Sequence, residues 1–349
     1  MTESRLERIM DAVVPLRREE PDDLFLVAAS FEDRCRRAAE KLSSKFTARA
    51  IVFQYEDTLE SVAGLANGRH LKSLLTASSI ESPDVLPCRF GDPFSATRVL
   101  DIWLQDHRCS SREPCITIDV TCFTKLHILL LLRLLEERLP QARIRILYTE
   151  PQAYATAFGR KLTYGISDTF YIPLNSGHNW GRAAALFVFL GHEPLRAERV
   201  IEEIEAEETI LIQGEPGYSP EMARMSERMN RYLLNRAWYN GEFKLASCST
   251  YEFTEVATLL SGLVNELDAR GIGTFYVAPL GTKLQALGID YVRRALPEKR
   301  LIVAYPAPAR YEKKYYSQGM GPTYSALLIP RPEARVPKVI CTDAGYDID

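Results

Sequence analysis

Short apolar runs and longer amphipathic stretches alternate along most of this chain. The clearest apolar runs in the N-terminal part begin at Leu24 (LFLVAA), Cys115 (CITIDVT) and Arg143 (RIRILY), and a Leu-rich stretch with helical spacing covers residues 126–139. Short apolar runs predict buried strands, and strands that alternate with helices of this length predict a mainly parallel sheet. The pattern therefore indicates an α/β fold.

The same alternation predicts a full set of elements. In the N-terminal part we expect strands at 24–29, 50–55, 85–90, 115–121 and 143–148, with helices between them and a short amphipathic helix at 6–14 before them. In the C-terminal part we expect strands at 183–190, 209–213, 244–248, 274–278, 301–305 and 324–330, and helices at 195–207, 221–234, 253–270 and 284–295. Ser30 and Asp33 are a candidate N-cap pair for a helix that runs to about residue 42.

A chain of 349 residues is too long for one ordinary core and suits two. We therefore predict two Rossmann-like three-layer halves with mainly parallel sheets, internally duplicated. The expected order is an N-terminal helix at 1–20, a first domain at 21–154, a connector at 155–177, a second domain at 178–331 and a tail at 332–349.

Two stretches with related motifs carry the evidence for duplication. One reads ITIDVTCFTKL, a helix, then RIRILYTEPQAY; the other reads TFYVAPLGTKLQALG, a helix, then RLIVAYPAPARY. Each has Thr-Lys-Leu before the helix and Tyr-x-x-Pro-x-x-Tyr after the next strand. The lysine and the first tyrosine are 23 residues apart in one copy (Lys125, Tyr148) and 22 in the other (Lys283, Tyr305). Two motifs thus recur in register.

The repeated lysines indicate function more strongly than the tyrosines do. A threonine cap and a proline after a strand are common structural solutions, and the tyrosine rings could simply pack. A lysine in the first turn of a helix opposes the positive end of the helix dipole, where it costs stability and attracts anions. We therefore expect Lys125 and Lys283 to face an anionic ligand in a shared cleft.

The loop before the second of these helices, Pro279-Leu280-Gly281-Thr282-Lys283, follows a predicted strand. Ligands of open parallel sheets bind beyond the carboxyl ends of the strands. A glycine that permits close approach, a hydroxyl and a cation suit a phosphate or nucleotide. The loop lacks the spacing of a Walker loop and of a G-x-G-x-x-G site, so neither ATP hydrolysis nor nicotinamide chemistry is supported.

A strand followed by a loop with Gly-Thr-Lys, as at 279–283, resembles the ligand loop of CARF domains, and tandem pairs of such domains in one chain are similar to SAVED domains. Both families sense cyclic oligonucleotides in prokaryotic antiviral defence. The first copy, Cys122-Phe123-Thr124-Lys125, departs from the motif because it has no glycine. The resemblance implies a ligand held between the two halves, with output through a separate effector protein or an activity in the same site.

The ligand-binding residues implied by this arrangement follow the predicted strands of both halves. They are Ser30, Glu32, Arg34, Thr121, Thr124, Lys125, Tyr148, Glu150, Tyr154, Gly191, His192, Glu193, Gly214, Gly217, Tyr218, Gly281, Thr282, Lys283, Tyr305 and Tyr311. For Arg34 we weigh a bidentate phosphate contact against an ordinary salt bridge.

An enzyme that processes a nucleotide or nucleic acid is the first alternative. Asp119 lies at the end of a predicted buried strand and, with Thr121 and Lys125, could form an acid–base or metal-assisted group. Glu150, after the next strand, could supply a second carboxylate. The competing role for Asp119 is to cap the following loop. The histidines show no H-E-x-x-H spacing, so we predict no metal site, and no cofactor site is indicated.

A protein-interaction module is the second alternative, since the Tyr-rich loops at 311–316 and 319–324 mix aromatic and charged residues. The overall charge of −3 argues against a protein that coats nucleic acid or a membrane. An odd number of cysteines, seven, excludes a complete disulfide framework, and the charged N-terminus has no signal-peptide core. These features predict a cytoplasmic protein that does not span a membrane.

Overall fold

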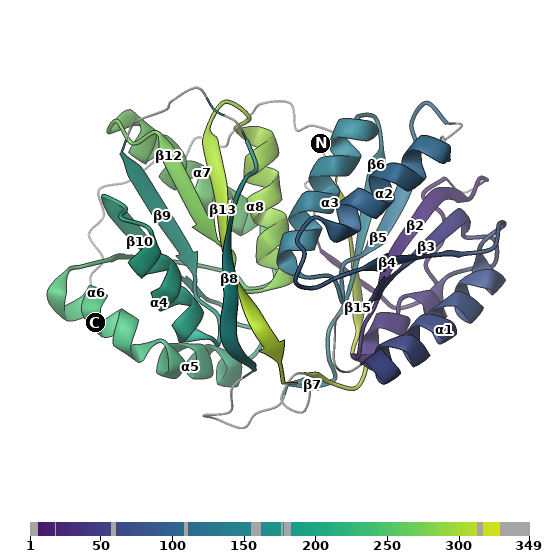
Figure 1. Ribbon diagram of the computed structural model, residues 1–349, viewed down its shortest axis with the longest axis horizontal. Coiled ribbons are helices and arrows are strands. Elements are labelled where there is room, and N and C mark those ends of the chain that lie inside the picture. Colours follow the sequence, from purple (N-terminus) through teal and green to yellow (C-terminus); the bar gives the residue numbers. More distant parts are fainter. Residues whose placement is uncertain are drawn as a thin grey trace.

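The computed structural model describes residues 6–17, 19–56, 61–107, 111–154, 162–175, 177, 183–312 and 317–328. In this part of the chain two large, mostly parallel sheets lie side by side, with helices α3 and α8 packed against each other between them (Figure 1). The predicted fold class, two Rossmann-like α/β halves, is confirmed. We call the part built around each sheet the first half and the second half.

The first sheet has seven strands in the order β1-β15-β6-β5-β2-β3-β4. The five from β6 to β4 are parallel, and β15 and β1 are antiparallel additions at one edge. Its strands are β1 (Glu7–Ile9), β2 (Asp22–Ala29), β3 (Thr47–Tyr55), β4 (Asp84–Cys88), β5 (Cys115–Asp119), β6 (Arg143–Thr149) and β15 (Thr323–Leu328).

The second sheet has six strands in the order β11-β10-β9-β12-β13-β8. Its five parallel strands repeat the order of the first sheet, and β8 pairs antiparallel with β13 just as β15 pairs with β6. Its strands are β8 (Thr163–Pro173), β9 (Ala184–Phe189), β10 (Glu208–Gly214), β11 (Lys244–Cys248), β12 (Thr274–Ala278) and β13 (Arg300–Tyr311), and a small separate sheet joins β7 (Ala153–Tyr154) to β14 (Ser317–Gln318).

Most helices lie where the apolar pattern predicts them. They are α1 (Ser61–Ser78), α2 (Ser95–Asp106), α3 (Lys125–Arg138), α4 (Pro194–Glu203), α5 (Pro220–Met229), α6 (Arg231–Asn240), α7 (Phe253–Ala269) and α8 (Lys283–Ala295). None of the helices in the described part of the chain combines the length and the apolar character needed to span a lipid bilayer.

Each half contributes side chains to the core of the other. Leu126, Leu129 and Leu130 of α3 belong to the hydrophobic cluster of the second half. Leu284 and Leu287 of α8 belong to the cluster of the first half. Burial of these side chains fixes the two helices against each other, because each large aliphatic side chain is worth about 1.5–3 kcal/mol when buried.

Several local predictions are wrong, each because tertiary packing overrides local pattern. Residues 6–14 contain strand β1 instead of a helix, because β15 offers them a partner edge. Residues 30–42 form two short 3₁₀ helices, Asp33–Arg36 and Ala39–Lys41, and the first has no side-chain cap from Ser30. The helix predicted at 221–234 is divided at Asn230 into α5 and α6.

Two further segments, β15 and β8, add an antiparallel strand to the first and the second sheet. The predicted strand at 324–330 is β15, which is coloured yellow in Figure 1 and lies beside β6 in the first sheet. The predicted connector at 155–177 includes β8, which pairs along almost all of β13. The domain boundaries given above stay a prediction, and the tail at 332–349 lies outside the described residues.

The strand order determines where a ligand can approach. In each sheet the chain order reverses between the first and fourth parallel strands, β2 and β5 in one half and β9 and β12 in the other. Crevices open at such reversal points, beyond the carboxyl ends of the strands. The loops that begin at Ser30, Val120, Leu190 and Pro279 all lie at these points.

Candidate functional site

A cavity of about 240 Å³ lies where the loops of the two halves meet. Most of the residues singled out from the sequence line it, although they come from distant parts of the chain. Those that do are Ser30, Glu32, Arg34, Thr124, Lys125, Tyr148, Gly191, His192, Glu193, Gly214, Gly217, Tyr218, Gly281, Thr282, Lys283, Tyr305 and Tyr311. Asp119, Thr121 and Glu150 are not among the lining residues, and the side chain of Tyr154 lies outside the described residues.

Two threonines begin the helices that carry the repeated lysines. The hydroxyl of Thr124 accepts a hydrogen bond from the backbone N–H of His127, and that of Thr282 accepts one from Gln285. The side chain of Gln285 in turn accepts from the N–H of Thr282, which completes a capping box. The Thr-Lys motif therefore places each lysine at the first position of its helix.

Each lysine reaches across to the loop of the opposite half. The ammonium group of Lys125 donates to the carbonyl oxygens of Leu280 (3.1 Å) and Gly281 (2.7 Å). The ammonium group of Lys283 donates to the carbonyl oxygen of Thr121 (2.7 Å). Both side chains are half-buried and line the same cavity. The duplication thus places two lysines so that each one contacts the loop of the other half.

The Lys125 contact depends on a close approach of two loops. A Cβ atom at Gly191 would lie 2.3 Å from the carbonyl oxygen of Leu280. Only glycine lets the loop after β9 lie this near the loop after β12, whose carbonyl groups hold Lys125. Gly191 therefore has a packing role next to the lysine.

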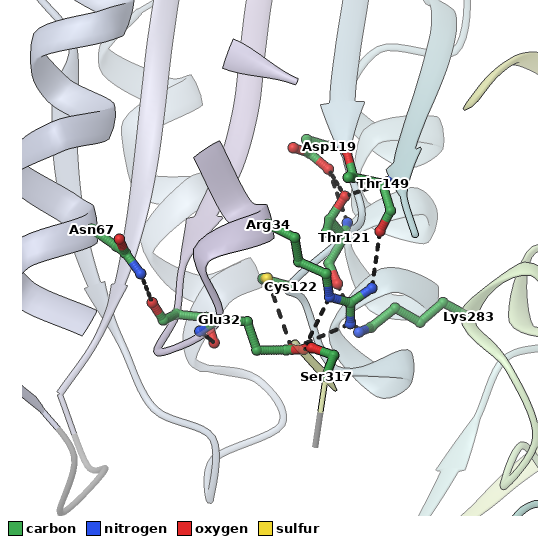
Figure 2. A network of polar contacts seen from close by, with 10 residues as sticks. Glu32, Arg34, Asn67, Asp119, Thr121, Cys122, Thr149, Lys283 and Ser317 are labelled. Atoms are coloured by element: carbon green, nitrogen blue, oxygen red, sulfur yellow. Dashed lines mark hydrogen bonds and ion pairs between the residues drawn. The ribbon is translucent and has the colours of Figure 1, made fainter. Parts of the chain in front are cut away.

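The first half contributes a buried cluster of Glu32, Arg34 and Tyr148. The Arg34 side chain donates to both carboxylate oxygens of Glu32, from Nε at 2.9 Å and from Nη2 at 3.3 Å, and its Nη1 donates to the carbonyl oxygen of Thr149 at 2.9 Å. Its guanidinium lies 5.9 Å from the ring centre of Tyr148. The hydroxyl of Ser317 also donates to Glu32, and Figure 2 shows Lys283 approaching this cluster from the second half.

The second half repeats this cluster with Glu193, Arg196 and Tyr305. Arg196 donates from Nη1 to Glu193 (2.8 Å) and from Nε to the carbonyl oxygen of Pro306 (2.8 Å), and its guanidinium lies 4.9 Å from the ring centre of Tyr305. The hydroxyl of Thr163 donates to Glu193, as that of Ser317 does to Glu32. The repeated tyrosines therefore serve to stack an arginine in each half.

Arg196 is the most important residue that the sequence reasoning missed. It follows Glu193 by three positions, whereas Arg34 follows Glu32 by two, so the two pairs do not align in a simple comparison of the halves. A usable signal was present, since an arginine in the first turn of a helix opposes the helix dipole just as the repeated lysines do. Other lining residues that it missed include Phe90, Met222, Met225, Met229, Gln285 and Ser317.

The cavity carries an excess of positive charge. Its lining holds four cationic side chains, those of Arg34, Lys125, Arg196 and Lys283, but only the two carboxylates Glu32 and Glu193. The carboxylates pair with the arginines, and the lysines are held by neutral carbonyl groups. Two ammonium charges thus have no carboxylate of their own in the cavity wall.

The pKa shifts follow from this arrangement. Burial, reinforced by the nearby Arg196, lowers the pKa of Lys125 to about 7, and burial also lowers the pKa of Lys283. Burial alone would raise the pKa of Glu32, but Arg34 and Lys283 hold it below its usual value. Glu193 behaves likewise beside Arg196. Each carboxylate is therefore ionised at neutral pH, and Lys125 is poised to change its charge there.

Asp119 has the contacts of a loop cap. One of its carboxylate oxygens accepts hydrogen bonds from the backbone N–H (3.0 Å) and the hydroxyl of Thr121, whose own oxygen accepts from the N–H of Thr149 (Figure 2). Asp119 is fully buried, and burial raises its pKa to about 6. Glu150 is half-buried, and burial raises its pKa as well.

Aromatic and sulfur-containing side chains form the remaining walls. Phe90 stacks on Tyr55 with ring centres 3.6 Å apart and lies 5.5 Å from Tyr311. On the opposite side, helix α5 has no buried residue and turns its half-buried methionines Met222, Met225 and Met229 toward the cavity. Such surfaces suit a flat, partly apolar group such as a nucleobase.

The described residues contain no group of His, Cys, Asp and Glu side chains arranged to hold a metal ion. Residues 313–316, in the first of the Tyr-rich loops, lie outside the described residues.

Comparison with known proteins identifies no close relative. No family model and no curated protein sequence matches this chain. Among solved structures, the chain is similar to a type III CRISPR defence DNA nuclease activated by cyclic oligoadenylate, with a TM-score of 0.42 and 11% identity. The match covers 78% of this chain and 63% of the nuclease, so this chain spans less than two thirds of that protein. A likeness this distant carries no argument about function.

Proposed function

We propose that the cavity between the halves binds a nucleotide or an oligonucleotide through its phosphate groups, and that the protein acts as a sensor of that ligand. The observation that carries the proposal is a cavity built by both halves in which two lysines have carbonyl acceptors and no carboxylate partner of their own. A phosphate group can replace the carbonyl acceptors of Lys125 and Lys283 and neutralise their charge, which the carbonyl groups cannot do.

The cavity walls support a nucleotide over a simple anion. The phenyl ring of Phe90 and the rings of Tyr218 and Tyr311 lie around the same space as the lysines. Bases stack on aromatic side chains while cations hold the phosphates, and this combination binds nucleotides without requiring a Walker loop. The methionines of α5 can adapt to the shape of a base.

The finer identity of the ligand is a prediction from the Gly-Thr-Lys resemblance. That resemblance implies that the ligand is a cyclic oligonucleotide, that the protein acts in prokaryotic antiviral defence, and that a separate effector protein gives the output. The cytoplasmic location is likewise a proposal made from the sequence alone. The charge and shape of the cavity support a nucleotide phosphate.

A thermal-shift screen of linear and cyclic nucleotides tests the proposal. A ligand at about a hundred times its dissociation constant should stabilise the native protein by about 3 kcal/mol. The Lys125→Ala/Lys283→Ala variant should lose this stabilisation, whereas Lys72→Ala, which removes an exposed lysine of α1, should keep it. Full affinity in the double variant, or no stabilising nucleotide at all, would contradict the proposal.

The same samples separate a sensor from an enzyme. Chromatography of the bound nucleotide after prolonged incubation should recover it intact. Turnover that disappears in Asp119→Asn with the fold retained would favour the enzyme hypothesis instead.

A further inference from the structure

The two buried arginines of the cavity differ in how many of their donors are used. All three side-chain nitrogen atoms of Arg34 donate within the first half, to Glu32 and to the carbonyl group of Thr149. Nη1 and Nε of Arg196 donate in the equivalent way, to Glu193 and Pro306. Its Nη2 atom is buried and donates to no acceptor in the described part of the chain.

The buried Nη2 donor of Arg196, which has no acceptor among the described residues, is unfavourable for the stability of the folded protein. Arg196 is only 4% exposed, and a buried donor without an acceptor destabilises the folded protein. Arg34 avoids this cost because it donates to Glu32 from two nitrogen atoms, whereas Arg196 donates to Glu193 from one. A bound ion or water molecule can supply the acceptor for such a donor.

The surroundings of Arg196 show which acceptor would fit. Arg196 lines the cavity, and it lies close enough to Lys125 of the other half for its charge to lower the pKa of that lysine. The carboxylate of Glu193 lies near both cations. An oxyanion with several oxygen atoms can accept from a guanidinium and an ammonium group together, as a phosphoryl group does.

We propose that Arg196, through its Nη2 atom, and Lys125 form an anchor for one phosphoryl group of the ligand, and that Arg34 serves chiefly to hold Glu32. This inference rests on the proposed function, because it takes the ligand to be a nucleotide phosphate. It adds that the two halves, although duplicated, contribute unequally: the second half supplies the guanidinium and the first half supplies the ammonium group.

Matched substitutions that keep the charge test the anchor, with inorganic pyrophosphate as the probe in isothermal calorimetry at constant ionic strength. Arg196→Lys keeps a cation but loses the planar fork, and it should raise the dissociation constant for pyrophosphate about tenfold. Arg34→Lys should raise it by a clearly smaller factor. Arg138→Lys, which changes an exposed arginine of α3 that pairs with Asp101 of α2, should leave it unchanged. Equal losses in the two cavity variants, or a larger loss in Arg34→Lys, would overturn the anchor.

A measurement on the unaltered protein covers the case in which Arg196→Lys fails to fold. With ¹⁵N-arginine labelling, pyrophosphate should shift the guanidinium resonances of Arg196 and leave those of Arg34 nearly in place, with Arg34→Lys used for assignment. Shifts confined to Arg34, or no shift in either, would overturn the inference. If nucleotides still bind through Lys125 and Lys283 in that case, the proposed function stands and only the anchor fails.

Discussion

The two halves of this protein share one arrangement of strands and helices but place different side chains around the cavity. Both sheets have the same order of parallel strands, both place a Thr-Lys helix start at the reversal point, and both stack an arginine on a tyrosine. They differ in the hydrogen bonds of the arginine, since every side-chain nitrogen of Arg34 has an acceptor and Nη2 of Arg196 has none among the described residues. They also differ in the cavity wall, to which the first half contributes Phe90 and the second half the methionines of α5. Duplication therefore explains the architecture, and the differences between copies determine what the cavity can recognise.

The crossover of the lysines makes the cavity a joint product of both halves. Lys125 lies beside the Glu193–Arg196 pair and Lys283 beside the Glu32–Arg34 pair, so each cluster is completed by the other half. The shared burial of α3 and α8 side chains fixes this geometry. A ligand that draws either lysine from its carbonyl acceptors would act on the contact between the halves.

Loss of a buried arginine should have the largest effect on stability and should separate the two clusters. Arg34→Met leaves Glu32 buried without its cation and should lower the free energy of unfolding by about 3–5 kcal/mol. Arg196→Met should cost about 1 kcal/mol less, because it also removes an unmet donor. Urea unfolding measures both values. A larger loss for Arg196→Met would contradict the difference in hydrogen bonding between the two arginines.

The pH dependence of binding should show how much the charge of Lys125 contributes to affinity. Its pKa of about 7 in the free protein means that the ammonium form, which attracts phosphate, is present below pH 7 and is lost above it. The affinity for a cyclic dinucleotide, whose charge is constant here, should therefore fall by up to tenfold for each pH unit above 7.

Two controls separate Lys125 from other titrating groups. Lys125→Arg should bind with a weaker dependence on pH, because arginine stays protonated. The dependence that remains should come from Lys283, whose pKa is also lowered by burial. His192 should not contribute above pH 7, since burial lowers its pKa, and Glu193 and Arg196 keep their charges throughout. A wild-type affinity that is flat from pH 6 to 9 would contradict the charge state assigned to Lys125.

The two threonine caps should give the smallest difference between the halves. Thr124→Ala removes one cap and should cost about 1 kcal/mol. Thr282→Ala should cost several tenths of a kcal/mol more, because Thr282 belongs to a capping box and also donates to the carbonyl oxygen of Thr250 (2.6 Å). Thermal unfolding resolves this. An equal or larger loss in Thr124→Ala would show that the second cap has no such advantage.

The sequence predicted the features that depend on local pattern. Apolar runs located strands such as Cys115–Asp119, and the helices predicted after the Thr-Lys repeats begin within one residue of the starts of α3 and α8. It also singled out most of the loops around the cavity, because the carboxyl ends of parallel strands meet at one edge. Whether those residues bind a ligand stays a prediction.

Features that depend on pairing between distant segments could not be predicted. Residues 6–14 have helical spacing, yet β1 forms because β15, more than three hundred residues away, provides an edge. Nothing local shows that β15 joins the first sheet rather than the second. Arg196 was missed because its spacing from Glu193 differs from that of Arg34 from Glu32, although tyrosine stacking makes the two arginines equivalent in space.

A crystal structure with the nucleotide that gives the largest thermal shift tests the phosphate site most directly. Phosphate oxygens should lie within hydrogen-bond distance of Nζ of both Lys125 and Lys283, inside the cavity between the halves. A nucleotide bound elsewhere, with both ammonium groups still on the carbonyl oxygens of Thr121, Leu280 and Gly281, would contradict it.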